Sequence, residues 1–141
     1  KAWGLAGLRC GFAIGGPGAE PLIDELGPPL GIGELAQAGV LEALRHGGKT
    51  VDRRTRRISV ERRRLLEGLR ELPLEVTPTQ ANIVWIAARS MDGAELAARL
   101  GRQRVVVRAG GPLGDARHVR VAIQGKLATD RLLREIARSL G

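Results

Sequence analysis

The residues with the clearest chemical potential stand at positions 1 to 11, KAWGLAGLRCG, where Lys1 is followed eight places later by Arg9. A lysine amine can condense reversibly with an aldehyde and, once displaced, can act as a base. An arginine suits a phosphate dianion, because it donates two parallel charge-assisted hydrogen bonds. Gly4 and Gly7 would let the backbone lie close to a bound ring or phosphate. The run therefore combines a covalent handle with an anion anchor.

Two further arginines, Arg108 and Arg120, lie in apolar runs nearer the C-terminus, RVVVR and HVRVAI. The alternation of a strand would place its residues on two faces. One face would hold His118, Arg120 and Ala122, and the other Val119, Val121 and Ile123. Burying an unpaired arginine is costly, so the face with Arg120 must look onto an anion or onto solvent.

Hydrophobic periodicity, with glycine and proline breaks, predicts the elements that position these residues. In chain order we expect a short buried strand at 11–15, helices at 20–26, 32–45 and 51–72, a buried strand at 81–87, a helix at 93–100, strands at 104–108 and 118–123, and a helix at 129–140. Asp92 and Glu95 form a capping-box-like pair for the helix at 93–100. The elements after Pro73 describe a small α/β layer, a short sheet covered on one face by helices.

The net charge of +8 permits nucleic-acid binding. Much of it lies in one run, Arg53, Arg54, Arg56, Arg57, Arg62, Arg63 and Arg64. Apolar residues at positions 58, 65, 69 and 72 recur near helical spacing, which predicts that these arginines lie mostly on the solvent side of one helix. Aromatic residues make up only 2% of the chain, so platforms for stacking bases are scarce. A basic nucleic-acid-binding module is therefore a remote alternative.

The single cysteine, Cys10, cannot form an internal disulfide, which fits a reducing compartment. His46 and His118 are too far apart in the sequence to offer the ligand spacing of a metal cluster. No stretch reaches the roughly 18 apolar residues of a membrane helix, and no leader pattern is present. We therefore expect a cytoplasmic protein without a metal site and without a membrane or nucleic-acid partner.

The run at 1–11 resembles the cofactor-lysine motif of class I and II aminotransferases, which use pyridoxal phosphate, and especially that of their histidinol-phosphate branch. Later segments resemble this family in the expected order. LAQAGVLEAL at 35–44 is similar to the helix after the lysine region, and TPTQANIVWI at 77–86 to the segment that opens the small domain. RVVVR and HVRVAI resemble the closing pair of strands, so the resemblance covers essentially the whole chain.

This resemblance implies an α/β fold, the C-terminal part of a fold-type I pyridoxal-phosphate-dependent transferase. Residues 1–72 would be the end of the large cofactor-binding domain with its connecting helices, and residues 73–141 the small C-terminal α/β domain. Other groups that the family needs, including an Asp for the pyridinium nitrogen and a phosphate loop, lie upstream of the lysine. We therefore expect this chain to be one part of a longer polypeptide, inactive by itself. The family is usually dimeric, so we expect the intact protein to be a homodimer.

The same resemblance implies a role for each candidate residue. Lys1 would hold the cofactor covalently and carry the catalytic proton, and Arg9 would bind the cofactor phosphate. Arg120 would bind the substrate α-carboxylate, and Arg108 the distal group, which is a phosphate in the histidinol-phosphate enzymes. The implied reaction moves an amino group between histidinol phosphate and a 2-oxo acid such as 2-oxoglutarate.

Some positions depart from the family pattern. Before the helix at 32–45, Pro29, Leu30 and Gly31 stand where histidinol-phosphate enzymes commonly carry an aromatic residue and Asn, and Gln124 stands where the family usually has Gly. These differences bear on the substrate more than on the reaction class. Aromatic amino acid aminotransferases and the threonine-phosphate decarboxylase of cobalamin synthesis are alternatives with the same fold, and a catalytically inactive relative is a further one.

Overall fold

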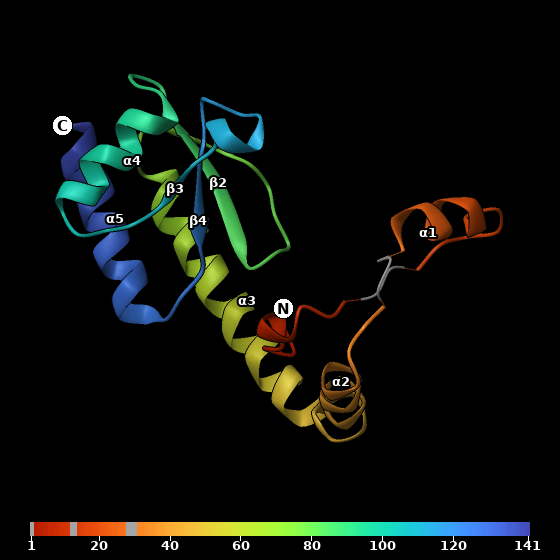
Figure 1. Ribbon diagram of the computed structural model, residues 1–141. Coiled ribbons are helices and arrows are strands. Elements are labelled where there is room, and N and C mark those ends of the chain that lie inside the picture. The colour runs from red at the N-terminus through yellow and green to blue at the C-terminus, as the bar shows by residue number, and fades with distance from the viewer. Residues whose placement is uncertain (1, 12–13, 28–30) are drawn as a thin grey trace. The chain divides into compact units, whose positions relative to one another are not determined.

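The protein is described by a computed structural model that covers residues 2–11, 14–27 and 31–141. The chain divides into two compact units, Lys1–Thr55 and Arg56–Gly141. Figure 1 shows the helices and strands of both. In the part of the chain that is described, no helix is long and apolar enough to cross a membrane.

The first unit is built from short helices joined by glycine-rich turns. Helix α1 spans Glu20–Leu26, helix α2 spans Glu34–His46, and helix α3, Gly48–Arg70, begins in this unit. Gly47 ends α2, and its amide donates a hydrogen bond of 2.7 Å to the carbonyl of Ala43. Neither α1 nor α2 contains a fully buried residue.

The buried strand predicted at 11–15 falls partly on residues 12 and 13, which lie outside the described residues. Its described residues form no strand, and Ile14 is 89% exposed. The prediction of a buried strand is therefore wrong at Ile14. An apolar run becomes a buried strand only when a neighbouring strand and a core accompany it, and the first unit has no described strand.

The second unit contains an antiparallel sheet of four strands. Strands β1 (Leu74–Val76), β2 (Ile83–Ala88), β3 (Arg108–Ala109) and β4 (Val119–Ala122) lie in the order β1-β2-β4-β3. Helices α4 (Gly93–Arg102), α5 (Lys126–Leu140) and the C-terminal part of α3 lie on one side of the sheet (Figure 1). The expected α/β layer, with helices on one face, is present.

The core of this unit lies between the sheet and the three helices. Its fully buried large side chains come from α3, α4, α5, β2 and β4, namely Leu65, Leu69, Leu96, Leu100, Ile136, Val84, Ile86 and Val119. Helix α4 begins where predicted, because the Asp92 carboxylate accepts a hydrogen bond of 2.8 Å from the Glu95 amide. Leu65 and Leu69 of α3 belong to this core, and the compact unit begins at Arg56, within α3. How the units correspond to the large and small domains of the intact protein stays a prediction.

The strand predicted at 104–108 is displaced. Arg104 has a positive φ of 58° and its amide bonds to the Gly101 carbonyl, so this residue ends helix α4 instead of starting a strand. Val105 also bonds back to Leu100, and sheet pairing begins only at Arg108. Strand β1 was not predicted, because three residues after a proline carry no periodicity to detect.

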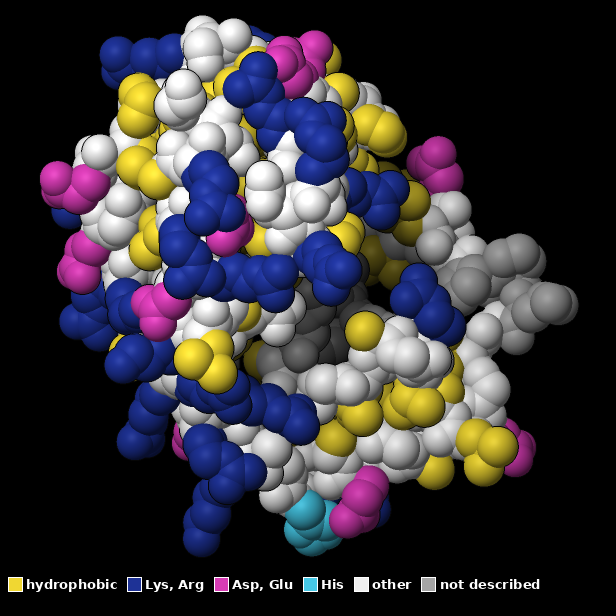
Figure 2. All heavy atoms as spheres, turned by 90° about the vertical axis from the view of Figure 1, so that its left-hand side faces the viewer, with side chains coloured by type: hydrophobic (Ala, Val, Ile, Leu, Met, Phe, Trp, Pro, Cys, Tyr) yellow, Lys and Arg dark blue, Asp and Glu magenta, His cyan; other side chains and the backbone are white. Residues whose placement is uncertain are grey.

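The charged residues on the outside of the helices agree with the prediction of a solvated surface. Arg53, Arg54, Arg56, Arg57 and Arg63 of α3 are exposed. Figure 2 shows Lys and Arg side chains spread over one face, with carboxylates among them. On the other helices of the second unit, arginines pair with acids of their own helix, Arg99 with Glu95 in α4 and Arg138 with Glu135 in α5. Such pairing is typical of ordinary helix surfaces and gives no support to a nucleic-acid site.

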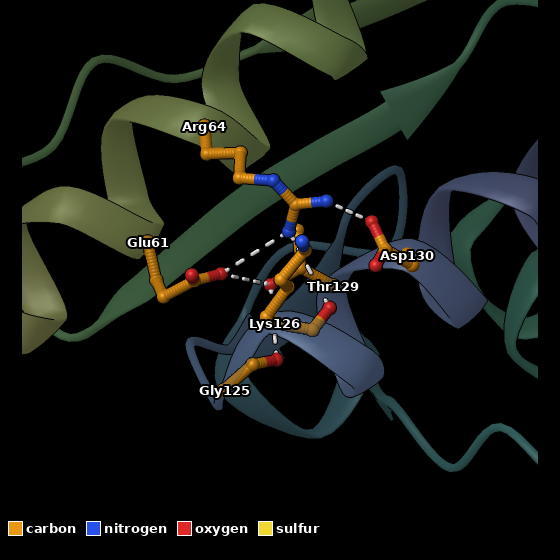
Figure 3. Close-up of polar contacts among 6 residues, drawn as sticks. All are labelled: Glu61, Arg64, Gly125, Lys126, Thr129 and Asp130. Atoms are coloured by element: carbon orange, nitrogen blue, oxygen red, sulfur yellow. Dashed lines mark hydrogen bonds and ion pairs between the residues drawn. The ribbon is translucent and has the colours of Figure 1, made fainter.

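One polar cluster joins helix α3 to the first turn of α5 (Figure 3). The Glu61 carboxylate is 8% exposed and accepts hydrogen bonds from the Thr129 hydroxyl at 2.9 Å and from Arg64 at 3.4 Å. Arg64 also pairs with Asp130 and bonds to the carbonyl of Lys126 at 3.4 Å. A carboxylate near the start of a helix is favoured by the helix dipole. The cluster therefore satisfies a buried charge and fixes α5 on α3.

Candidate active site

The segment that carries the candidate cofactor arginine is a compact turn at the start of the first unit. Ala6–Leu8 form one 3-10 turn, and Arg9 follows with a positive φ of 52°. The Arg9 amide and its guanidinium Nη1 both donate to the Ala6 carbonyl, at 3.2 and 3.1 Å. Left-handed backbone is uncommon for a non-glycine residue and persists where its surroundings hold it. The turn thus fixes the base of the Arg9 side chain and leaves other guanidinium N–H groups available.

A cavity of about 720 Å³ lies beside this turn. Its walls come from the turn and from helix α2, and they are Trp3, Leu5, Ala6, Arg9, Cys10, Gly11, Val40, Ala43 and Leu44. Mostly apolar walls with a charged group at one place are typical of sites for small organic ligands. Arg9 is the charged member, so an anionic group of a ligand has a partner here.

The covalent part of the candidate site, Lys1, lies outside the described residues. The described neighbours fit pyridoxal phosphate in their chemistry, since an exposed guanidinium suits the phosphate and apolar walls suit the ring. Among the described residues, no group of His, Cys, Asp and Glu side chains that could hold a metal ion is found.

The candidate substrate arginines meet in the sheet of the second unit. Arg108 of β3 and Arg120 of β4 are direct partners in the antiparallel register, and Trp85 of β2 lies opposite Arg120 on its other side. The predicted division of faces at β4 is confirmed, because Val119, Val121 and Ile123 are at most 5% exposed while Arg120 is half-buried and Ala122 exposed. The row Trp85, Arg120 and Arg108 therefore lies on the face away from the helices.

Two positive side chains directly opposite each other in a sheet repel. No ion pair joins either Arg108 or Arg120 to an Asp or Glu within the described part of the chain. The strands hold the pair in place, because the Val119 and Val121 side chains on the opposite face are buried. A bound anion would remove the repulsion, and an anion with two charged groups would match both guanidinium groups.

A histidine and an aspartate border this row. The His118 Nδ1 atom lies 2.8 Å from the Asp115 Oδ2 atom, close enough for an ion pair, although the contact lacks the geometry of a hydrogen bond. The His118 ring meets Trp85 edge to face, with centroids 6.2 Å apart. Contact with His118 lowers the pKa of Asp115 below its usual value of 3.8. Asp115 therefore stays ionised at neutral pH and places a negative charge beside His118.

Comparison with known proteins assigns the chain to a family. The family described as aminotransferase class I and II matches residues 1–140. The chain belongs to the class I and II aminotransferases. An aromatic amino acid aminotransferase of Corynebacterium efficiens is 34% identical over 134 residues, which cover 95% of this chain and 35% of that protein. This aminotransferase chain thus spans about a third of the length of the curated relatives that it matches.

Solved structures show the same fold. The α-aminoadipate aminotransferase of Thermus thermophilus, complexed with N-(5'-phosphopyridoxyl)-L-leucine, has a TM-score of 0.75 at 23% identity and matches 96% of this chain and 38% of its own. The histidinol-phosphate aminotransferase of Clostridium acetobutylicum has a TM-score of 0.69 at 23% identity, over 82% of this chain and 36% of its own. The expected assignment to fold-type I, the pyridoxal-phosphate-dependent fold of this family, is confirmed.

Proposed function

We propose that the protein containing this chain transfers an amino group between an aromatic amino acid and a dicarboxylic 2-oxo acid such as 2-oxoglutarate, with pyridoxal phosphate bound to Lys1. The observation that carries the proposal is the Arg108–Arg120 pair on the open face of the sheet. The aromatic donor is supported by the relative from Corynebacterium efficiens, an aromatic amino acid aminotransferase.

The two arginines have different tasks in this proposal. Arg120 lies centrally, between Trp85 and Arg108, and binds the α-carboxylate that every amino acid and 2-oxo acid carries. Arg108 is more exposed, in the two-residue strand β3, and binds a second anionic group where the substrate has one. A planar guanidinium donates two hydrogen bonds to a carboxylate, so the pair recognises both ends of 2-oxoglutarate.

The N-terminal turn serves the cofactor. Pyridoxal phosphate supplies an electron-withdrawing ring that makes the substrate Cα–H bond acidic. Arg9 binds its phosphate, and the Lys1 amine links it to the protein and carries the proton to and from the substrate Cα. The apolar side chains of α2 that line this cavity suit the ring of the cofactor. We also propose that the intact protein is a homodimer in the cytoplasm, with small molecules as its substrates.

Histidinol phosphate is the second candidate for the amino donor. The position of Arg108 favours this donor. With the rest of histidinol phosphate beside Arg120, the phosphate dianion would lie against Arg108, whose guanidinium has no carboxylate partner among the described residues. The two donors differ in one testable respect. Phenylalanine and tyrosine have no distal anion, so only histidinol phosphate needs Arg108.

Steady-state kinetics of the intact protein test these roles. Arg120→Ala should lower kcat/KM about 30- to 1000-fold for every substrate, because each loses its α-carboxylate partner, worth about 2–4 kcal/mol. Arg108→Ala should have a similar effect on 2-oxoglutarate and leave phenylalanine with pyruvate within about twofold. Arg102→Ala, an exposed arginine at the end of α4, is the matched control.

Two results would count against the proposal. If Arg108→Ala lowered kcat/KM equally for all substrates, Arg108 would not be specific for substrates with a second anionic group. A wild-type preference for histidinol phosphate over phenylalanine of more than about tenfold in kcat/KM, which equals 1.4 kcal/mol, would select the second donor.

A further inference from the structure

An arginine of the basic run on α3 contacts the backbone that follows Lys1. The Arg54 guanidinium Nη1 donates to the Trp3 carbonyl at 2.8 Å and to the Ala2 carbonyl at 3.3 Å. Both carbonyls lie in the two residues immediately after the candidate cofactor lysine. All these residues belong to the first compact unit. One charged side chain thus joins the start of α3 to a segment more than fifty residues away in the sequence.

The same segment is shaped to receive this contact. Gly4 has a positive φ of 75°, and a Cβ atom there would lie 2.7 Å from Arg54 Nη1. Trp3 packs on the junction between α2 and α3, where a Cβ atom on Gly47 would lie 2.9 Å from the Trp3 ring. A side chain at position 47 would meet the Trp3 ring and the Ala43 carbonyl, and one at position 4 would be strained by the positive φ and would displace the Arg54 guanidinium. The segment is therefore held at two places, by its ring on the helix junction and by its carbonyls on Arg54.

We propose that Arg54 is a positioning residue for the cofactor lysine, acting through the backbone carbonyls of Ala2 and Trp3. The inference rests on the proposed function of Lys1. The flexible stem of a lysine already gives its amine a wide range of positions, and a fixed backbone narrows that range. Charge-assisted hydrogen bonds to two successive carbonyls restrain that backbone without occupying the site. Arg54 touches neither substrate nor cofactor in this role.

Arg54→Ala in the intact protein, with Arg53→Ala as a matched control, tests the proposal. Arg53 is the neighbouring exposed arginine, and we find no hydrogen bond from it to a described residue. In Arg54→Ala we expect kcat to fall about 10- to 100-fold while KM for the amino donor changes less than about threefold, because a displaced amine slows the chemical step. Arg54→Lys should recover part of the loss, since one charged donor remains. Arg53→Ala should stay within about twofold of wild type.

A readout independent of turnover separates positioning from mere stabilisation. We expect the pH midpoint of the visible absorbance of the bound cofactor to shift in Arg54→Ala and not in Arg53→Ala. The thermal unfolding temperature of the cofactor-free protein measures only the contribution of Arg54 to the stability of the fold. If Arg54→Ala fails to fold, Arg54→Lys takes its place, with the same shift expected in smaller size.

Three outcomes overturn the inference. The first is an unchanged absorbance midpoint with unchanged kcat, and the second is a kcat loss accompanied only by a lower unfolding temperature of the cofactor-free protein. In both, borohydride reduction and mass spectrometry would still find the cofactor on Lys1, so the proposed function would stand without the role of Arg54. The third is a wild-type protein in which reduction leaves Lys1 unmodified, and then the proposed function falls together with the inference.

Discussion

Thr129 provides the closest hydrogen bond to the most buried carboxylate of the polar cluster in Figure 3. Glu61 is 8% exposed, and its Oε2 atom accepts from the Thr129 hydroxyl at 2.9 Å and from the more distant Arg64 at 3.4 Å. A buried charge that loses a hydrogen-bond partner keeps its desolvation cost. The Thr129 hydroxyl should therefore contribute to the stability of the protein by keeping the buried Glu61 carboxylate hydrogen-bonded.

Thr129→Val keeps the shape of the side chain and removes the donor. We expect it to lower the free energy of unfolding by about 1–2 kcal/mol, measured by urea denaturation followed by circular dichroism. In the background of Glu61→Met, where no carboxylate needs a partner, the same change should cost less than about 0.5 kcal/mol. Equal costs in the two backgrounds would show that the hydroxyl does not support Glu61.

Single residues also show which contacts the sequence alone does not indicate. The arginine run on α3 predicts a solvated face, and Arg54 is indeed exposed, yet its guanidinium binds carbonyls about fifty positions away. No spacing rule signals such a contact. The sequence indicates Arg108 and Arg120 as separate candidates, but their pairing depends on the register of β3 on β4, which the alternation of each strand does not determine.

The end of helix α4 shows how an element boundary decides a residue's conformation. The helix stops at Arg102, Gln103 caps it, and Arg104 turns left-handed with φ 58°. The Val105 amide then bonds to the Leu100 carbonyl. Such helix ends favour glycine at the left-handed position, since a Cβ atom is strained there. Arg104 is exposed, so its side chain offers little compensation.

Glycine substitutions at Arg102 and Arg104 should therefore change the free energy of unfolding in opposite directions. Arg104→Gly is expected to raise the free energy of unfolding by about 0.5–1 kcal/mol through relief of the left-handed strain. Arg102→Gly, in the last helical residue, is expected to lower it by up to about 1 kcal/mol, because glycine is a poor helix former. Chemical denaturation of both variants measures the two signs. A loss of stability in both would contradict the assignment of Arg104 as the helix stop.

The same boundary explains which elements the sequence could predict. Helices α2 to α5 have long apolar stripes or clear caps, and all were expected within a few residues of their observed bounds. The run RVVVR looks like a strand by composition, but the helix before it uses Arg104 and Val105 to close its last turn. Sheet pairing is then left to Arg108 and Ala109. Tertiary context overrode propensity at this point.

At the scale of the whole molecule, the two compact units differ in how they bury apolar side chains. Every hydrophobic residue that is fully buried in the described chain lies between Leu65 and Ile136, in the second unit. The first unit instead exposes Ile14, Leu26 and Leu35 by 89%, 71% and 89%. Because buried apolar surface drives folding, the second unit has its own core, whereas the residues described in the first unit form none.

Hydrogen exchange of the 141-residue chain by itself should therefore divide at the unit boundary. Hydrogen-bonded amides of β2, β4 and α5 in the second unit should be protected to the extent of global unfolding, whereas those of α2 in the first unit should exchange through local opening. In the intact protein, where the rest of the polypeptide is present, we expect protection in both units. Leu96→Ala, which empties a fully buried site, should lower the protection free energy of the second unit by about 2–5 kcal/mol, while Leu35→Ala should change neither unit. Equal protection of both units in the short chain would show that residues 2–55 are stabilised by contacts other than a core of their own.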